Sequence, residues 1–352
     1  MYPKIHIHLK KYQENLSIIS QLCSNANVGI LAVTKVFRAD QMLIDIINQS
    51  DVNMIGDSRL LNLKSIQTTK PKVLLRIPQV FEVSDVVKYA DISLASELEI
   101  IDLIQVEAKR LNRKHQIILM FDIGDLREGI YYKEDYLKII NQILKMDAIE
   151  LIGIGTNLTC YGGVIPTHET YEKLELIKKS IEETFQMTLK IISGGNSSSI
   201  PLLANQELPS YINQLRIGEA LVLGRETAYG NPIIGMHDDV FTLEASIIEL
   251  KRKPSMPEGI LGRDAFGHPV KFFDQGEIQR AILAIGRQDI HPDHLIPPKG
   301  VEILGASSDH LIVQIQGLNL EVGDTIEFKL TYGGILSLMT SPYVEKHYVK
   351  SL

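Results

Sequence analysis

Short apolar runs recur along the first two-thirds of the chain, and the segments between them have the spacing of amphipathic helices. In residues 168–186, for example, Leu174, Ile177 and Ile181 fall on one face at helical intervals. Continuous apolar strands that alternate with amphipathic helices are typical of a parallel sheet covered by helices. The strand-like runs are residues 28–33, 52–55, 73–77, 92–95, 117–121, 151–154, 189–192 and 215–223.

The number of strand–helix units decides between two parallel architectures. Eight units suit a closed (β/α)8 TIM barrel. An open doubly wound sheet is the alternative, but the glycine-rich dinucleotide fingerprint that normally follows its first strand is missing after residue 33. The pattern therefore predicts an α/β fold, with the barrel over residues 1–230.

The pattern changes after residue 229, where short strand-like runs are separated by turn-rich segments and no long amphipathic helix is evident. This predicts a C-terminal all-β domain over residues 231–352. Residues 5–9 alternate between apolar and polar in the same way, so residues 1–10 are expected to contribute a strand that joins the β domain. The later runs are residues 240–250, 281–285, 301–304, 311–315 and 325–330.

Composition narrows the class of protein. The 352 residues carry a net charge of −7 with both signs interspersed, which gives no support for a nucleic-acid surface. The N-terminus lacks the apolar core of a signal peptide, and no apolar run reaches the ~18 residues of a membrane span. Cys23 and Cys160 form no CxxC pair, so neither a metal site nor a disulfide framework is expected. We therefore expect a cytoplasmic protein.

Three segments carry candidate chemistry. Lys35 ends the first predicted strand, and a lysine at the carboxyl end of a barrel strand can act as a nucleophilic amine. The serine- and glycine-rich loop 193–199 follows the seventh strand, where barrels commonly bind phosphate. Arg216 and Gly218 lie in the neighbouring eighth unit. Each feature alone is common on protein surfaces, but their joint placement favours a phosphorylated cofactor bound beside Lys35.

These segments resemble the alanine racemase-type (fold type III) enzymes, which bind pyridoxal 5′-phosphate (PLP). The resemblance covers nearly the whole chain and implies a PLP-binding barrel followed by a β domain. It implies that Lys35 binds PLP as a Schiff base and that Arg127 lies near the substrate carboxylate. Arg216 would contact the pyridine nitrogen, and Asn157 replaces the histidine that packs against the ring. The similar segments are residues 32–35, 122–129, 195–198 and 216–218, and the residues expected at PLP also include Asn196, Ser197, Ile217 and Gly218.

Residues 155–163, 284–289 and 305–310 are similar to the ornithine racemase branch of this family. The resemblance therefore implies a racemase that removes and returns the Cα proton of a free amino acid, with ornithine as the expected substrate. The alternatives are an alanine or broad-specificity racemase, a basic amino-acid decarboxylase, and a PLP carrier without turnover. Carriers resemble the barrel alone. Decarboxylases of this type carry a cysteine motif near the C-terminus, whereas no cysteine follows Cys160.

The chain departs from the family at the second acid–base group. The catalytic tyrosine of alanine racemases corresponds here to Arg287, and an arginine stays protonated and is a poor general base. Cys160, Asp289, Tyr332 and a water relayed through Arg287 remain open for that role. The resemblance also implies a head-to-tail homodimer in which the partner's β domain closes the pocket. Asp289 and Asp309 are expected to bind the basic end of the substrate.

Overall fold

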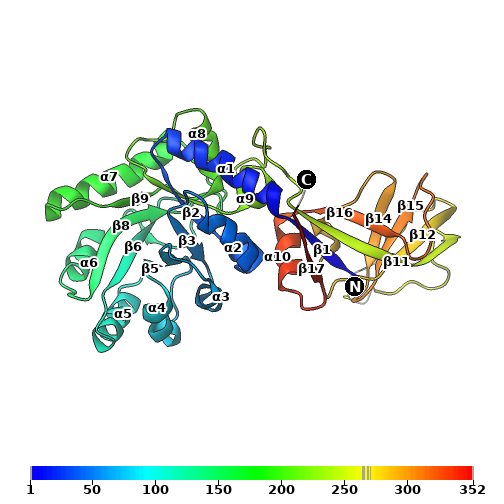
Figure 1. The fold of residues 1–352 in the computed structure, drawn as a ribbon, viewed down its shortest axis with the longest axis horizontal. Helices are drawn as coiled ribbons and strands as arrows, with labels where there is room; N and C mark the ends of the chain where they lie inside the picture. The colour runs from blue at the N-terminus through cyan, green and yellow to red at the C-terminus, as the bar shows by residue number, and fades with distance from the viewer. Residues whose placement is uncertain (1, 264–265, 268, 270, 351–352) are drawn as a thin grey trace. The chain divides into compact units, whose positions relative to one another are not determined.

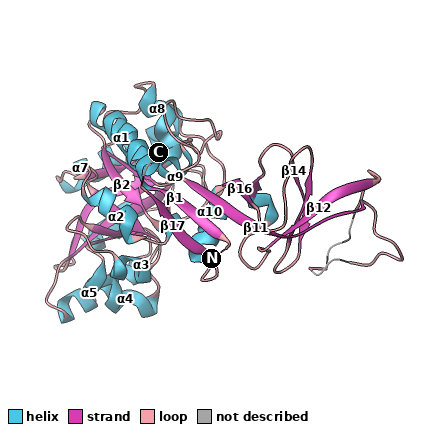
Figure 2. Ribbon diagram, turned by 45° about the vertical axis from the view of Figure 1, so that its right-hand side comes forward, coloured by secondary structure: helices cyan, strands magenta, loops and turns pink. Residues whose placement is uncertain are grey.

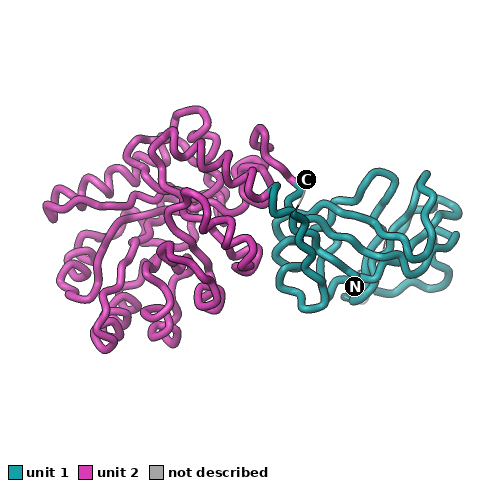
Figure 3. The backbone as a smooth tube through the Cα atoms, viewed as in Figure 1, with its two compact units in different colours: residues 1–11, 239–352 teal, residues 12–238 magenta. Residues whose placement is uncertain are grey.

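The computed structural model describes residues 2–263, 266–267, 269 and 271–350. The chain divides into two compact units (Figure 3). We call residues 12–238 the barrel unit, and residues 1–11 together with 239–352 the sheet unit. The predicted domains also include Met1 and residues 264, 265, 268, 270, 351 and 352, which lie outside the described residues.

Eight parallel strands form a closed ring in the barrel unit. They are β2 (Gly29–Val33), β3 (Met54–Asp57), β4 (Lys72–Leu74), β5 (Ile92–Ala95), β6 (His115–Asp122), β8 (Ile149–Thr156), β9 (Ile191–Ser193) and β10 (Gln214–Ile217). Their order is β5-β4-β3-β2-β10-β9-β8-β6, and β5 pairs with β6 to close the ring. The short β7 (Ile130–Tyr131) pairs with the end of β6. The predicted (β/α)8 barrel is therefore confirmed.

Helices surround this ring (Figure 1). The expected helix over residues 168–186 is α7 (His168–Phe185), which begins after Thr167, whose hydroxyl accepts the N–H of Thr170, and which buries Leu174, Ile177 and Ile181. The others are α1 (Leu9–Asn25), α2 (Gln41–Asn48), α3 (Leu60–Ser65), α4 (Val83–Tyr89), α5 (Leu98–Arg110), α6 (Tyr136–Ile143), α8 (Ile200–Ala204) and α9 (Glu219–Leu223). Across the described part of the chain, no helix has the length and apolar character needed to cross a membrane.

The barrel has a packed interior. Large apolar side chains from same-face positions of five strands form one buried cluster, which consists of Leu31, Val33, Val73, Ile92, Leu94, Ile118, Met120 and Ile152. Gly56 leaves space for the side chain of Leu31, because a Cβ at position 56 would lie 2.4 Å from a methyl carbon of Leu31. A filled interior leaves the strand ends and their loops as the surface on which this fold builds sites.

The sheet unit is built on antiparallel pairing (Figure 2). Its strands are β1 (Lys4–His8), β11 (Phe241–Pro254), β12 (Glu277–Leu283), β13 (Leu295–Ile296), β14 (Val301–Ala306), β15 (Leu311–Ile315), β16 (Thr325–Leu330) and β17 (Glu345–Val349). Six of them follow the order β13-β16-β11-β12-β15-β14, and β1 pairs with β11 and, in parallel, with β17. The buried Ile5 and Ile7 alternate with polar residues along β1, as expected from the sequence.

The structure corrects two local readings of the sequence. The apolar run 215–223 is a strand only as far as Ile217, after which Glu219–Leu223 form α9. A short buried apolar run lacks a period that separates strand from helix. The sheet unit also contains a helix, α10 (Tyr332–Thr340), which the sequence pattern did not indicate. Its adjacent Gly333 and Gly334 are weak helix formers, so tertiary packing decides this segment.

Candidate active site

Lys35 lies at the carboxyl end of β2. The preceding Thr34 is buried and fixed twice: its hydroxyl donates to Asp57 Oδ2 at 2.7 Å, and its N–H donates to the carbonyl oxygen of Gly56 at 2.9 Å. Lys35 then begins the 3-10 turn Lys35–Phe37, whose other two residues are buried while Lys35 is exposed. The buried neighbours anchor the turn and leave the lysine amine accessible.

The serine-rich loop follows β9 and turns at Gly195, whose φ of +109° favours glycine. Asn196 fixes the loop, because its Oδ1 accepts the N–H of Ser198 at 2.8 Å and its Nδ2 donates to the carbonyl oxygen of Leu158 at 2.8 Å. The Ser197 hydroxyl accepts an N–H from the first turn of α9 at 3.3 Å. These hydrogen bonds fix the loop without the help of a ligand.

Ile217 and Gly218 bring a second backbone segment to this end of the barrel. Ile217 ends β10, has a buried side chain and pairs with Ala32 of β2. Gly218 immediately precedes α9, and a Cβ there would lie 3.0 Å from Cβ of Val33. The close approach places this segment beside the strand that precedes Lys35.

Arg216 is the buried cation of the site. Its Nη1 donates to Ser193 Oγ at 2.6 Å, and its Nη2 donates to the carbonyl oxygen of Thr156 at 2.5 Å and to Asn157 Oδ1 at 2.7 Å. Burial lowers the pKa of Arg216 to about 10, while the negative charge of Glu128 acts in the opposite direction. The guanidinium therefore stays protonated at neutral pH.

Asn157 and Glu128 connect Arg216 to Arg127. Asn157 Nδ2 donates to Glu128 Oε1, and the two carboxylate oxygens of Glu128 accept from Nε and Nη2 of Arg127. Burial would raise the pKa of Glu128, but the hydrogen bonds and charge of Arg127 hold it below its ordinary value. Glu128 was not among the predicted site residues. Its position directly after the expected carboxylate-binding arginine was the signal that could have found it.

The segment 122–129 is a tight turn that presents Arg127. Oδ1 of Asp122 accepts two N–H groups of this turn, at 2.8 and 3.1 Å. Gly129 has a φ of +127°, and a Cβ there would lie 2.5 Å from the backbone nitrogen of Asp122. The aspartate and glycine around Arg127 are therefore required by the turn itself.

Cys160 lies in the loop after β8, is exposed and is a free thiol. The buried carboxylate of Asp125 holds this loop by accepting the N–H groups of Cys160, Tyr161 and Val164 at 3.2, 3.0 and 3.0 Å. The Cys160 Sγ accepts from Asn196 Nδ2 at 3.2 Å. The structure thus brings Cys160 next to the serine-rich loop.

The donors gathered here suit the cofactor that the sequence resemblance implies. The hydroxyls of Ser198 and Thr156 are buried and have no hydrogen-bond partner within the described residues, so each can donate to an added acceptor. A phosphate needs such donors at a backbone turn. A guanidinium has five N–H groups, and Arg216 uses three in the bonds above, which leaves donors for a ring nitrogen. Together with the amine of Lys35, these groups fit PLP.

Arg287, Asp289 and Asp309 belong to the sheet unit. The loops that carry Arg287 and Asp309 touch through their backbones: the N–H of Arg287 donates to the carbonyl oxygen of Ser307 at 2.9 Å, and a Cβ at Gly286 would lie 2.4 Å from the nitrogen of Asp309. The Asp309 carboxylate is 67% exposed. Two neighbouring serine hydroxyls donate to it and lower its pKa. The predicted site residues are therefore divided between the two units.

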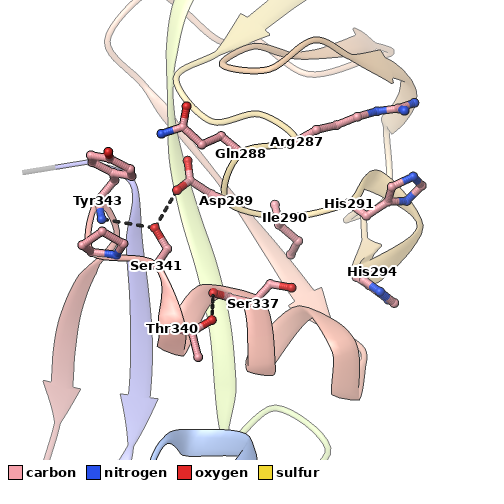
Figure 4. Close-up of a pocket in the computed structure, with 11 residues that line it drawn as sticks. Arg287, Gln288, Asp289, Ile290, His291, His294, Ser337, Thr340, Ser341 and Tyr343 are labelled. Carbon is pink, nitrogen blue, oxygen red and sulfur yellow. Dashed lines mark hydrogen bonds between the residues drawn. The ribbon is translucent and has the colours of Figure 1, made fainter. Parts of the chain in front are cut away.

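A pocket of about 460 Å³ opens in the sheet unit (Figure 4). Asp289 and Ser341 point toward each other there, and the hydroxyl donates to Asp289 Oδ1 at 2.6 Å. The guanidinium of Arg287 lies 4.3 Å from the centre of the Phe266 ring, a cation–π arrangement. The pocket is lined by Arg287, Gln288, Asp289, Ile290, His291, His294, Ser337, Thr340, Ser341, Pro342 and Tyr343.

Comparison with known proteins agrees with this architecture. Residues 7–226 match the family described as alanine racemase, N-terminal domain. Ornithine racemase of Acetoanaerobium sticklandii is 47% identical over 350 residues, covering 98% of this chain and 99% of that protein. Lysine racemase of Thermotoga maritima is 39% identical over 357 residues, covering 100% of both.

Among solved structures, alanine racemase from Bartonella henselae with covalently bound pyridoxal phosphate matches with a TM-score of 0.74 at 18% identity, covering 99% of this chain and 100% of that one. This likeness supports the fold, and the two relatives confirm the predicted enzyme class of amino-acid racemase. Matched by the family over residues 7–226 and by relatives along its whole length, the chain belongs to the alanine racemase family, which is PLP-dependent.

Proposed function

We propose that this protein racemises free ornithine, with PLP bound at the carboxyl end of the barrel and attached to Lys35. The observation that carries the substrate assignment is the 47% identity to an ornithine racemase over 98% of the chain. The lysine racemase relative, at 39% identity, makes lysine the second substrate to test. Two residues support the cofactor assignment: exposed Lys35, which follows β2, and buried, charged Arg216 on the neighbouring β10.

PLP, when bound, supplies the delocalisation of negative charge that allows an amino acid to lose its Cα proton. Lys35 holds and returns that proton on one face of Cα. Arg127 orients the substrate carboxylate through charge-assisted hydrogen bonds. Arg216 donates a hydrogen bond but keeps its proton, so the ring nitrogen stays unprotonated and side reactions such as transamination are disfavoured.

Inversion at Cα needs a second proton carrier on the opposite face. In the barrel unit the candidate is Cys160, whose exposed thiol lies beside the serine-rich loop. In the sheet unit the candidates are Asp289, Tyr332 and a water held by Arg287, whose own guanidinium is a poor base. A thiol, a carboxylate, a phenol and a bound water can each carry a proton.

Incubation of the purified holoprotein with L-ornithine in D₂O tests the function. We expect deuterium at Cα together with accumulation of D-ornithine on chiral chromatography. Release of carbon dioxide would instead identify a decarboxylase. A protein that binds PLP but neither exchanges the Cα proton nor forms any D-amino acid from ornithine, lysine or alanine would be a carrier, and would contradict the proposal.

We propose that the carboxylates of Asp309 and Asp289 select the basic side chain of the substrate. Asp309→Ala should raise KM for ornithine about tenfold, because a charge-assisted hydrogen bond is worth roughly 1.5–3 kcal/mol, and should change KM for alanine by less than twofold. Steady-state kinetics with both amino acids measure the difference. The control is Asp147→Ala, an equally exposed carboxylate before β8. Equal effects on ornithine and alanine would contradict the assignment.

We also propose that the enzyme is a cytoplasmic head-to-tail homodimer. The family resemblance implies this assembly, and the expected site residues lie in two different units of the chain. The free thiols of Cys23 and Cys160 support a reducing compartment. Light scattering should give the mass of two chains, and a fully active monomer would contradict the dimer.

A further inference from the structure

We propose that Glu128 is a positioning residue for substrate binding: it grips one edge of the Arg127 guanidinium so that the other edge faces the substrate carboxylate. The inference rests on the proposed function, because that function assigns Arg127 to the carboxylate of the amino acid. It adds a residue that acts through Arg127 and does not itself touch the substrate.

The atoms that Glu128 uses define which edge of Arg127 is left. Its two oxygens accept from Nε and Nη2, the side-on edge of the guanidinium. A guanidinium has five N–H groups in a fixed plane, so three N–H groups on Nη1 and Nη2 are not used by Glu128. Two of these three form the end-on edge, whose spacing matches a second carboxylate. Arg127 can therefore bind Glu128 and a substrate carboxylate at the same time.

Asn157 fixes the carboxylate of Glu128 in turn. The amide has one acceptor and one donor end, and its neighbours require opposite ends: Arg216 Nη2 donates to Oδ1, while Glu128 Oε1 accepts from Nδ2. Reversal of the amide would oppose donor to donor at Arg216 and acceptor to acceptor at Glu128. The orientation of Arg127 is thus set by a chain that ends on the buried Arg216.

The charges around Glu128 also indicate that it is the anchor of the pair. Glu128 lies between two cations, and the charges of both Arg127 and Arg216 favour its ionised form. Its side chain is 19% exposed and that of Arg127 is 38% exposed, so the carboxylate is the more enclosed member of the pair. The enclosed anion serves as the fixed anchor, and the more accessible cation is the group that receives the ligand.

Glu128→Gln is the sharpest variant because it keeps the size of the side chain. A glutamine amide offers one oxygen. In the place of Oε1 this oxygen still accepts from Asn157 Nδ2 and Arg127 Nη2, but the amide NH₂ in the place of Oε2 then faces Arg127 Nε, a second donor. Arg127 loses its two-point grip while the barrel keeps its shape. Glu107→Gln is the matched control. Glu107 lies on helix α5 and accepts from Nε and Nη2 of Arg110 in the same side-on geometry.

We expect Glu128→Gln to raise KM for L-ornithine about 10- to 100-fold, the loss expected when a charge-assisted contact is weakened, and to leave kcat within about threefold. The carboxylate is bound alike before and during proton transfer, so the effect falls on KM. Calorimetry provides a reading that does not depend on turnover. Glu128→Gln should weaken binding of 5-aminopentanoate, which keeps the carboxylate, and leave binding of 1,4-diaminobutane, which lacks it, unchanged.

A double-mutant cycle tests whether Glu128 acts through Arg127. In an Arg127→Leu background, Glu128→Gln should add less than a twofold further rise in KM. Additive effects, an unchanged KM in the single variant, or a fall in kcat alone would each overturn the inference. A lower KM would also overturn it, because Glu128 would then compete with the substrate for Arg127.

Failure of the proposed function has a different signature. If the proposed function is wrong, the wild-type enzyme does not turn over ornithine. If only the inference is wrong, the wild-type enzyme turns over ornithine and the Glu128→Gln variant has the same KM. If another amino acid is the substrate, the same KM comparison applies to it, since every amino acid carries the carboxylate that Arg127 is proposed to bind.

Discussion

Lys35→Ala should lower kcat for ornithine racemisation by at least about 10³-fold. The variant loses the amine proposed to attach the cofactor and, with it, the proton carrier on one face of Cα, and general acid–base catalysis alone contributes about 10²–10⁴-fold. Chiral chromatography of D-ornithine formed from the L-enantiomer measures the loss. A second reading is mass spectrometry after borohydride treatment, which should find PLP fixed to the peptide containing residue 35 in the wild type and absent from that peptide in the variant.

The fold of Lys35→Ala should be unchanged, because the lysine side chain is exposed and the turn is anchored by buried Val36 and Phe37. Lys35→Arg, which keeps the charge but lacks a primary amine, should be equally inactive. Lys145→Ala removes another exposed lysine of the barrel unit and should retain full activity. Turnover by Lys35→Ala at the wild-type rate would contradict both the attachment of the cofactor to Lys35 and the proposed mechanism.

Arg127→Leu should lower kcat/KM for ornithine about 100-fold or more, mainly through KM. The variant removes two charge-assisted hydrogen bonds to the substrate carboxylate, each worth roughly 1.5–3 kcal/mol. It also leaves Glu128 without its main ionic partner, so the pKa of Glu128 should rise, since Arg127 is what holds it down. Initial-rate kinetics over a range of L-ornithine concentrations measure the effect.

Arg127→Lys separates charge from geometry. Lysine keeps the positive charge but cannot offer two parallel N–H groups, so we expect an intermediate loss in kcat/KM. Arg110→Leu removes an arginine with the same two-point contact to a glutamate on α5 and should leave the kinetics unchanged. An Arg127→Leu enzyme with a normal KM would show that another group binds the carboxylate.

The barrel could be predicted from the sequence because its strands are short and almost wholly buried, so they appear as continuous apolar runs. The run 92–95 coincides with β5 because all four of its residues are buried. The run 215–223 was misread because residues 220–223 are just as buried in α9 as they would be in a strand. Helix α10 was missed for the opposite reason, since two adjacent glycines hide a helix that packing enforces.

Site residues could be predicted from the sequence only where they lie at the end of a barrel strand. Lys35 and Arg216 were found because the end of a barrel strand is itself a prediction of location. Glu128 and Asp125 were not found, because their roles depend on partners far along the chain: Glu128 meets Asn157 across 29 positions, and Asp125 meets Cys160 across 35. Neither spacing nor composition encodes such contacts, which exist only once the loops are folded.

The pairing of β1 has a consequence for the order of events during translation. Lys4 pairs with Glu244 of β11 and with Glu345 of β17, so β1 needs a strand that is synthesised long after it. At roughly 5–20 residues per second, position 345 is polymerised about 17–68 s after position 4. A nascent chain stalled anywhere between residues 239 and 344 would carry all of the barrel sequence and an N-terminal strand whose Ile5 and Ile7 still lack their full sheet. Such a chain would expose apolar side chains of the kind that holdase chaperones bind, and the sheet unit is completed only after β17 has been synthesised.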